Sequence, residues 1–377
     1  MKRLVLISAV FFAFILSTGF LQDKEYTIAR LRDLYSGDPA KWPEAHLDAA
    51  AKIGFRDIGA LGKPEYPAAN PYSKEKEKLG KILFFDPRMS LSKQIACASC
   101  HDPELGWGDG RRVAYGHDRQ NGKRNAMTIL NTAFYEKLFW DGRASSLEAQ
   151  AAFPVQDHVE MNQDLTVMVK NIKSIKGYQP LFQSAFGDAT VTLDKIQQAI
   201  ATFERGVVSR NTRFDAFVKG NKTALKDDEL MGLHLFRTKA RCINCHNTPL
   251  FSDNRFHNDG QALMGSKMED RGLYNLTHNL KDIGAFRTPS LRETSITGPW
   301  MHNGNFPSLR DVIELYNLGN QIRISRSAVV PDSLRNPASP LLRKLNLTLT
   351  ERQQLEAFLK SISTSVQKMF PPQLPAE

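Results

Sequence analysis

The sequence predicts an all-α protein built from two units of similar size with long loops, and three observations support this fold class. Apolar residues recur at the three- and four-residue spacing of helices over 78–85, 193–203, 230–236 and 355–362. The period-two alternation that is typical of strands is scarce. The motif Cys-x-x-Cys-His occurs twice, beginning at Cys97 and at Cys242, so each unit would carry one copy.

Residues 1–21 read as an export signal or an N-terminal membrane anchor. Lys2 and Arg3 precede an apolar stretch from Leu4 to Leu16, which is the order of a secretory signal and is short for a membrane span. The stretch that follows lacks a clean small-x-small cleavage site, so an uncleaved anchor stays open as the alternative. Either interpretation predicts an exported, periplasmic protein.

The rest of the chain divides into three parts. Residues 22–70 are polar and interrupted by prolines, and they read as an N-terminal extension. Two domains follow, over 71–215 and 216–377, because each then holds one motif and its own helical runs. Helix starts are marked by three capping-box patterns, Ser145-x-x-Glu148, Ser308-x-x-Asp311 and Thr350-x-x-Gln353.

Composition and charge exclude several classes of protein. Of the 377 residues, 41% are apolar and 24% are charged, which indicates neither a disordered chain nor a bundle of membrane spans. The formal net charge is +10, but lysines and arginines are scattered and form no basic arm. Nucleic acid is therefore not an expected partner.

The two motifs, Cys97-Ala98-Ser99-Cys100-His101 and Cys242-Ile243-Asn244-Cys245-His246, are haem-attachment sequences. The two cysteines of such a motif can each form a thioether with a haem vinyl group, and the adjacent histidine can bind the iron. Zinc sites and redox dithiols also use paired cysteines, but zinc pairs usually lack the adjacent histidine, and a redox dithiol would not occur twice in a chain with no other cysteine. We therefore predict two covalently bound haem c groups, with His101 and His246 as iron ligands.

Around these motifs the sequence resembles the bacterial dihaem cytochrome c peroxidase and MauG family, over residues 71–363. The resemblance implies two cytochrome c-like haem domains. It assigns the reaction with hydrogen peroxide to the haem of the N-terminal domain, and electron relay to the haem of the C-terminal domain. The matching segments are Arg124-Asn125-Ala126, Phe139-Trp140-Asp141-Gly142-Arg143-Ala144, Gln150, Pro154, Glu160-Met161, Phe286-Arg287-Thr288-Pro289-Ser290-Leu291-Arg292 and Thr297-Gly298-Pro299-Trp300-Met301-His302-Asn303-Gly304.

The resemblance also implies roles for residues near the first haem. Glu160 matches an acid that moves the peroxide proton to the departing oxygen, and Gln150 matches a polar residue of the same pocket. Trp140 matches a tryptophan that carries electrons between the haems, and His117 a displaceable sixth ligand of the first iron. By residue type alone, Glu160 and His117 would be solvated and Trp140 would be a core aromatic.

Two further matches concern the second haem and the space between the haems. Asn125, Thr297 and Pro299 match the oxygen donors of a calcium ion, although residue type alone would make them turn residues. Tyr316 matches the far-side iron ligand of MauG-type members, where classical peroxidases have a methionine. A tyrosinate is a hard anionic donor that favours ferric iron. The alternative is that Tyr316 belongs to an ordinary apolar helix face.

The resemblance favours one function over two others. The first is a periplasmic peroxidase that reduces hydrogen peroxide to water with electrons from a small cytochrome or copper protein. The second is a MauG-like oxidase that modifies a partner protein through high-valent iron, but Ala240 stands where MauG has a surface tryptophan that oxidises its substrate. The third is a dihaem electron carrier without catalysis. Family members are often dimers, so a homodimer is also expected.

Overall fold

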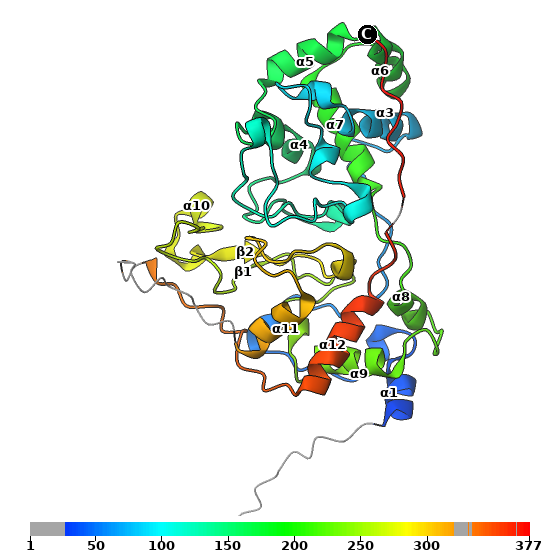
Figure 1. Ribbon diagram of the computed structural model, residues 1–377. Coiled ribbons are helices and arrows are strands. Elements are labelled where there is room, and N and C mark those ends of the chain that lie inside the picture. The colour runs from blue at the N-terminus through cyan, green and yellow to red at the C-terminus, as the bar shows by residue number, and fades with distance from the viewer. Residues whose placement is uncertain (1–26, 320–330, 332–333, 367) are drawn as a thin grey trace, which may run out of the picture.

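The computed structural model describes residues 27–319, 331, 334–366 and 368–377. Within them the chain forms two helical lobes, with a small sheet between them (Figure 1). The helix-rich fold that the sequence predicts is confirmed. The helices are α1 (Ile28–Tyr35), α2 (Ala49–Lys52), α3 (Lys74–Phe84), α4 (Leu147–Gln156), α5 (Leu165–Ser174), α6 (Gln179–Phe186), α7 (Leu193–Arg205), α8 (Arg213–Val218), α9 (Asp227–Arg237), α10 (Tyr274–Thr277), α11 (Leu309–Asn317) and α12 (Leu349–Ser361).

The upper lobe in Figure 1 is built around the crossing of α3 and α7. α3 begins after Ser73, whose hydroxyl accepts a hydrogen bond from the backbone N–H of Lys76 (3.1 Å). Leu79 and Leu83 are fully buried on its inner face. The helices approach closely because a Cβ at Gly80 would lie 1.9 Å from the carbonyl oxygen of Ala199 in α7. A larger residue at position 80 would force the two helices apart.

The lower lobe repeats this plan with α9 and α12. A Cβ at Gly232 in α9 would lie 2.0 Å from the carbonyl oxygen of Gln354 in α12. Three phenylalanines, Phe236, Phe251 and Phe358, pack around the crossing with ring centroids 5.3 to 6.2 Å apart. In each lobe, therefore, the helix that precedes the Cys-x-x-Cys-His motif crosses the last helix of the lobe at a glycine.

The sheet consists of β1 (Phe256–Asn258) and β2 (Ala285–Arg287), which run antiparallel with Phe256 opposite Arg287. Both strands lie in the long segment between the second motif and α11, which the sequence predicts as loop. Each strand has only three residues, which is too short for a periodic pattern to reveal.

The structure corrects two of the three helix starts that the sequence predicts. The cap of α4 is Ser146 instead of Ser145, and the cap of α12 is Thr348 instead of Thr350. Ser308 caps α11 as predicted. Where two candidate caps lie close together in the sequence, the one that is used depends on how the helix packs, and residue type cannot decide this.

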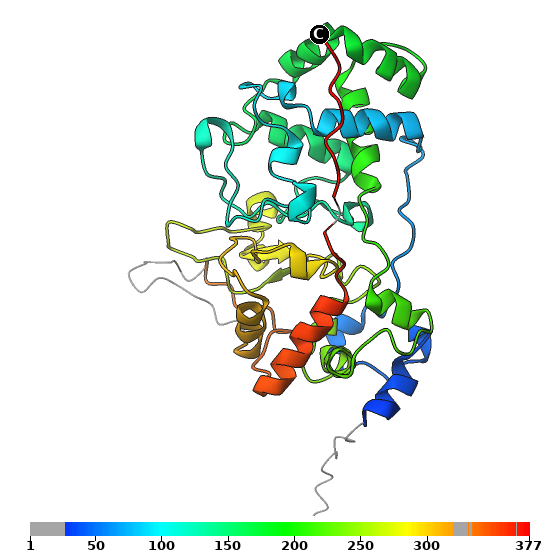
Figure 2. The same cartoon turned by 45° about the vertical axis from the view of Figure 1, so that its right-hand side comes forward.

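The chain ends cross between the lobes. Segment 22–70 precedes the upper lobe in sequence, but its Leu31, Tyr35 and Ile58 are fully buried in the core of the lower lobe. The C-terminal segment after α12 runs back along the upper lobe (Figure 2). There the Arg88 side chain donates to the carbonyl oxygen of Pro375 (3.1 Å). The backbone N–H of Gly177 donates to the carbonyl oxygen of Ala376 (3.2 Å). Both ends therefore tie the lobes together.

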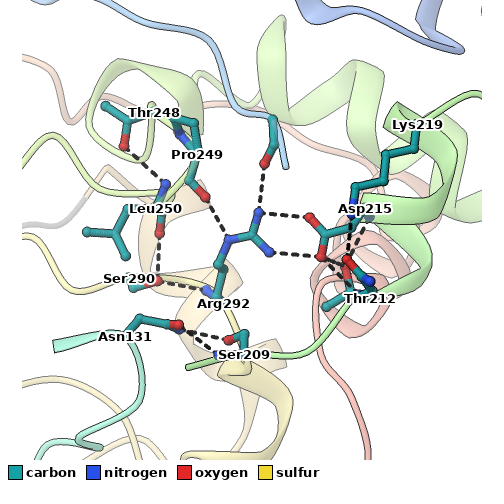
Figure 3. A network of polar contacts seen from close by, with 12 residues as sticks. Asn131, Ser209, Thr212, Asp215, Lys219, Thr248, Pro249, Leu250, Ser290 and Arg292 are labelled. Carbon is teal, nitrogen blue, oxygen red and sulfur yellow. Dashed lines mark hydrogen bonds and ion pairs between the residues drawn. The ribbon is translucent and has the colours of Figure 1, made fainter. Parts of the chain in front are cut away.

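Arg292 joins three segments of the lower lobe (Figure 3). Its guanidinium forms two hydrogen bonds with the Asp215 carboxylate of α8 (3.0 and 3.1 Å). It also donates to the carbonyl oxygens of Pro249, after the second motif, and of Gly59, in segment 22–70 (2.6 and 2.7 Å). Arg292 is 1% exposed, and its charge is balanced by a buried carboxylate.

No helix within the described ranges is long and apolar enough to cross a membrane. The predicted signal or anchor, residues 1–21, lies outside the described residues.

Candidate haem-binding sites

Both Cys-x-x-Cys-His motifs adopt the same tight turn. Cys97–Ser99 and Cys242–Asn244 each form one turn of 3₁₀ helix. The backbone N–H of His101 donates to the carbonyl oxygen of Cys97 (3.0 Å), and that of His246 to the carbonyl oxygen of Cys242 (2.9 Å). None of the four cysteines is in a disulfide. Each turn presents two thiols and one imidazole from five consecutive residues, as haem attachment requires.

Both histidines are oriented for metal binding. The Nδ1 atom of His101 lies 3.2 Å from the carbonyl oxygen of Trp107, and that of His246 lies 3.1 Å from that of Phe251. This contact fixes the tautomer and leaves Nε2 as the ligand atom. Burial lowers the pKa of both imidazoles, so that both are neutral, which is the form that binds iron. The residues present therefore fit haem c at both motifs.

A large cavity opens beside the second motif, and its wall is mainly apolar. Cys242, Cys245 and His246 line one side of it. Leu309, Val312 and Ile313 of α11 also line it, so the apolar face of α11 forms part of the cavity wall. A planar apolar cofactor would supply the packing that the chain itself lacks here.

Tyr316 lies on the same face of α11 and lines this cavity, close to both cysteines of the second motif. Burial, and after it the charge of Asp259, raise the pKa of the Tyr316 phenol well above its usual range. Its environment therefore favours the neutral phenol unless a cation binds the oxygen. The arrangement brings Tyr316 and His246 to one cavity, as the resemblance implies.

The residues that the sequence places between the haems come together in the wall of the same cavity. Trp140, Asn125, Thr297 and Pro299 all line it. The indole N–H of Trp140 donates to the carbonyl oxygen of Asn125 (3.0 Å), and the amide of Asn125 donates to the carbonyl oxygen of Arg111 (2.9 Å). The calcium ion itself stays a prediction.

Glu160 lies beside the first motif, in the turn that follows α4. Burial, and then the charge of Asp157, raise the pKa of the Glu160 carboxyl. The same carboxylate contributes, after burial, to raising the pKa of the Cys100 thiol to about 12. Glu160 is therefore a partly buried acid near the first haem attachment.

The loop that carries His117 packs directly against this turn. The backbone N–H of His117 donates to the carbonyl oxygens of Val159 and Glu160 (both 2.8 Å). A Cβ at Gly116 would lie 2.0 Å from the carbonyl oxygen of Val159, so only glycine permits this approach. The Nδ1 atom of His117 is buried and has no hydrogen-bond partner. The structure thus places His117 next to Glu160, while its predicted role as an iron ligand stays a prediction.

Gln150 lies in α4, the helix that directly precedes the turn with Glu160. Its backbone N–H donates to the carbonyl oxygen of Ser146 (2.9 Å). Its predicted place in the distal pocket stays a prediction.

Glu204, at the end of α7, was not singled out by the sequence. It is 5% exposed, burial raises its pKa to about 8, and its charge acts on the Cys97 thiol.

His302 was also not singled out, although it lies within a segment that carries the family resemblance. Its ring stacks on Phe286 with centroids 3.6 Å apart and lies edge-on to Trp140 at 6.4 Å. The side chain is buried, and neither ring nitrogen has a hydrogen-bond partner. Burial lowers its pKa to about 3. Its position in the segment was visible in the sequence, but its contacts depend on two strands and a loop that only the fold brings together.

Comparisons with known proteins agree with this geometry. Residues 74–223 match the family model described as "Di-haem cytochrome c peroxidase". The chain is 37% identical to cytochrome-c peroxidase IdrP1 of Pseudomonas sp. (strain SCT), over 82% of this chain and 87% of the relative. It is 38% identical to methylamine utilization protein MauG of Methylophilus methylotrophus, over 82% of this chain and 88% of the relative.

Solved structures show the same fold. A crystal structure of a MauG-like protein associated with microbial copper homeostasis matches with a TM-score of 0.73 and 30% identity, over 80% of this chain and 93% of that protein. The diheme peroxidase BthA of Burkholderia thailandensis E264 matches in fold, with a TM-score of 0.68, 24% identity and coverage of 86% of this chain and 96% of that protein. The chain therefore belongs to the dihaem cytochrome c peroxidase and MauG family of haem-dependent oxidoreductases.

Proposed function

We propose that the protein is a periplasmic peroxidase that reduces hydrogen peroxide to two molecules of water, with two electrons from a small cytochrome or copper protein and two protons. The observation that carries the proposal is Glu160, a partly buried carboxyl beside the first haem attachment with a raised pKa. An electron carrier without catalysis has no need of such a group. The N-terminal export signal, a homodimer and one interhaem calcium ion belong to the same proposal.

The haem of the first motif supplies the iron at which peroxide binds and is reduced. Glu160 would accept a proton from the bound peroxide and return it to the departing oxygen, so that water leaves. A raised pKa suits both transfers, because a carboxyl whose pKa lies closer to neutral pH can both accept and release a proton there. Gln150 and His117 would complete the polar side of this pocket.

Trp140 would provide the path for electrons between the second haem and the first site. This residue lies in the wall of the second cavity, its indole N–H is bound by the Asn125 carbonyl, and it belongs to the first half of the chain. A fixed aromatic ring between the lobes shortens the distance that an electron must cross. The second haem lets the protein store one of the two electrons near the reacting centre.

A MauG-like oxidase that modifies a partner protein is the second candidate, and Tyr316 is the observation that favours it. Tyr316 lines the second cavity together with His246, so its phenol would be available to a haem iron there, as the resemblance to MauG-type members implies. Against this, Ala240 is 4% exposed and carries no oxidisable side chain at the position of the MauG surface tryptophan. We therefore rank the peroxidase first.

Peroxide turnover by the purified dihaem protein tests the proposal. Peroxide is mixed with the enzyme alone, with a reduced small cytochrome, and with a reduced copper protein. A peroxidase consumes peroxide continuously and oxidises two equivalents of donor for each peroxide. A MauG-like oxidase would consume peroxide only with its protein substrate, and an electron carrier would not accelerate peroxide loss in any of the mixtures.

A further inference from the structure

Arg287, the last residue of β2, is buried without a carboxylate partner among the described residues. It is 2% exposed. Its Nε atom donates to the carbonyl oxygen of Phe139 (3.2 Å), and its Nη2 atom contacts the sulfur of Met127 (3.4 Å). The guanidinium carbon lies 3.6 Å from the centre of the Tyr135 ring. Its Nη1 atom is buried and has no hydrogen-bond partner.

An arginine keeps its charge in a protein, and a buried charge is costly unless an anion pairs with it. Arg292, five residues later, shows how this chain meets that requirement. It is equally buried, but it binds Asp215 through both terminal nitrogens and two carbonyl oxygens besides (Figure 3). Arg287 has the same demand, and its two Nη1 protons remain for an anion that is not part of the described chain.

Arg287 lines the cavity of the second motif, and the other cationic side chains described there already have acids. Arg241 and Arg343 both pair with Asp48, at 2.6 and 2.9 Å. His257 pairs with Asp253 at 2.8 Å. The Nε and Nη2 atoms of Arg241 are also buried without a hydrogen-bond partner, but Arg241 is ion-paired with Asp48. Among the described cations of this wall other than His246, Arg287 alone has no acid partner.

We propose that Arg287 binds a propionate carboxylate of the haem that is attached to Cys242 and Cys245. The inference rests on haem attachment at the second motif and not on peroxide reduction. A haem brings two carboxylates into a largely apolar cavity, and each needs a donor there. The planar guanidinium, with both Nη1 protons available, meets that need.

The position of Arg287 gives this contact a second consequence. Its guanidinium is held by Tyr135 and by the Phe139 carbonyl, which belong to the first half of the chain, and its backbone N–H donates to the carbonyl oxygen of Trp140 (2.8 Å). A propionate on Arg287 would therefore fix the edge of the second haem beside Trp140. The fixed positive charge also favours the reduced iron, which carries one positive charge less.

The test is a spectroelectrochemical titration of the purified dihaem protein, after an assay of denatured haem has shown two covalent haems per chain. Arg287→Gln removes the charge and should shift the reduction equilibrium of the second haem at least tenfold toward the oxidised form, which is 59 mV for one electron. Arg287→Lys should recover most of this shift. Arg343→Gln, which removes a half-exposed and paired charge of the same cavity, should give less than half of it.

The resonance Raman bands of propionate bending give a second readout, which should change in Arg287→Gln and in Arg287→Lys but not in Arg343→Gln. If Arg287→Gln does not fold, the Raman spectrum of Arg287→Lys still decides. Added phosphate should leave the wild-type potential unchanged, because the bound carboxylate is part of the haem. Unshifted potentials and bands in the Arg287 variants, or a phosphate-dependent potential, would overturn the proposal. Peroxide turnover enters none of these measurements.

Discussion

Two carboxyls with raised pKa values lie near the first haem motif, whereas the second motif opens on a mainly apolar cavity lined by two tyrosines and by an arginine without an acid partner. Near the first, Glu160 and Glu204 both have pKa values raised by burial. Near the second, Tyr316 and Arg287 line a largely apolar cavity. The turns themselves are alike, down to the backbone carbonyl at each histidine Nδ1. The chemistry of each iron therefore depends on side chains outside the motif.

This difference suits a division of labour. A carboxyl that can accept and return a proton serves a site where an O–O bond breaks. An apolar cavity with a fixed charge serves a site that only changes its oxidation state, because few groups there need to rearrange. Four experiments test this difference between the two sites.

The largest effect is expected from removing a thioether. Cys97→Ala and Cys242→Ala should each reduce covalent haem from two per chain toward one, because a single thioether remains to hold that haem. Cys97→Ala should also abolish most peroxide turnover, while Cys242→Ala should leave the first site able to bind peroxide. Denatured-haem assays and optical titration with peroxide measure both, with Ala98→Ser as the control. One haem in the wild type would remove the basis of the comparison.

Loss of the acid at the first site should be the next largest effect. Glu160→Gln should keep both haems but slow peroxide cleavage about 10²-fold or more, because the proton transfer is lost. In the wild type the rate should rise with pH as Glu160 ionises, at a pH above the usual glutamate range because its pKa is raised. That limb should be missing in the variant. Exposed Glu104 provides the control as Glu104→Gln, and equal stopped-flow rates for both variants would make Glu160 structural.

At the second site, Tyr316→Phe tests ligation. If the phenolate binds the iron, its loss should raise the reduction potential of that haem and alter its optical spectrum, because a hard anionic donor is removed. If Tyr316 only packs, the change keeps nearly all of its volume and should alter neither. Tyr135→Phe is a control in the same cavity, since its hydroxyl already accepts from the Ser290 N–H (2.7 Å). Identical redox curves for wild type and Tyr316→Phe would make Met301, which also lines the cavity, the next candidate.

The smallest effect concerns Glu204 and stability. Burial raises its pKa from 4.5 to about 8, so between these values the folded protein keeps a proton that the unfolded chain loses. Stability should therefore fall as pH rises through this window. Glu204→Gln should remove that loss, on the order of 1 to 3 kcal/mol at pH 8 and almost nothing at pH 4.5. Thermal unfolding at both pH values measures this change in stability, with Glu136→Gln at an exposed position as the control. If the stability difference between Glu204→Gln and the wild type is the same at both pH values, Glu204 is ionised in the folded protein.

The haem-attachment motifs, the helix-rich fold class and the main helices could all be predicted from the sequence. Five consecutive residues hold both thiols and the imidazole of each motif, so their meeting needs no long-range folding. The cores of α3, α7, α9 and α12 follow from helical periodicity, because one face of each must be buried. Family resemblance added Glu160, Trp140 and Tyr316, and the fold places all three beside a motif or in its cavity.

The surroundings of the two motifs and the way in which the two lobes are joined depend on contacts that form only in the folded chain. Leu31, Tyr35 and Ile58 lie in the lower core and residues 375–376 contact the upper lobe, so these contacts join segments that are far apart in the sequence. The pairing of buried charges also depends on the folded chain. Arg287 and Arg292 are identical residues in one short segment, yet the fold gives Asp215 to Arg292 and leaves Arg287 without an acid. Such pairing depends on positions far apart in the sequence, which periodicity and motifs do not record.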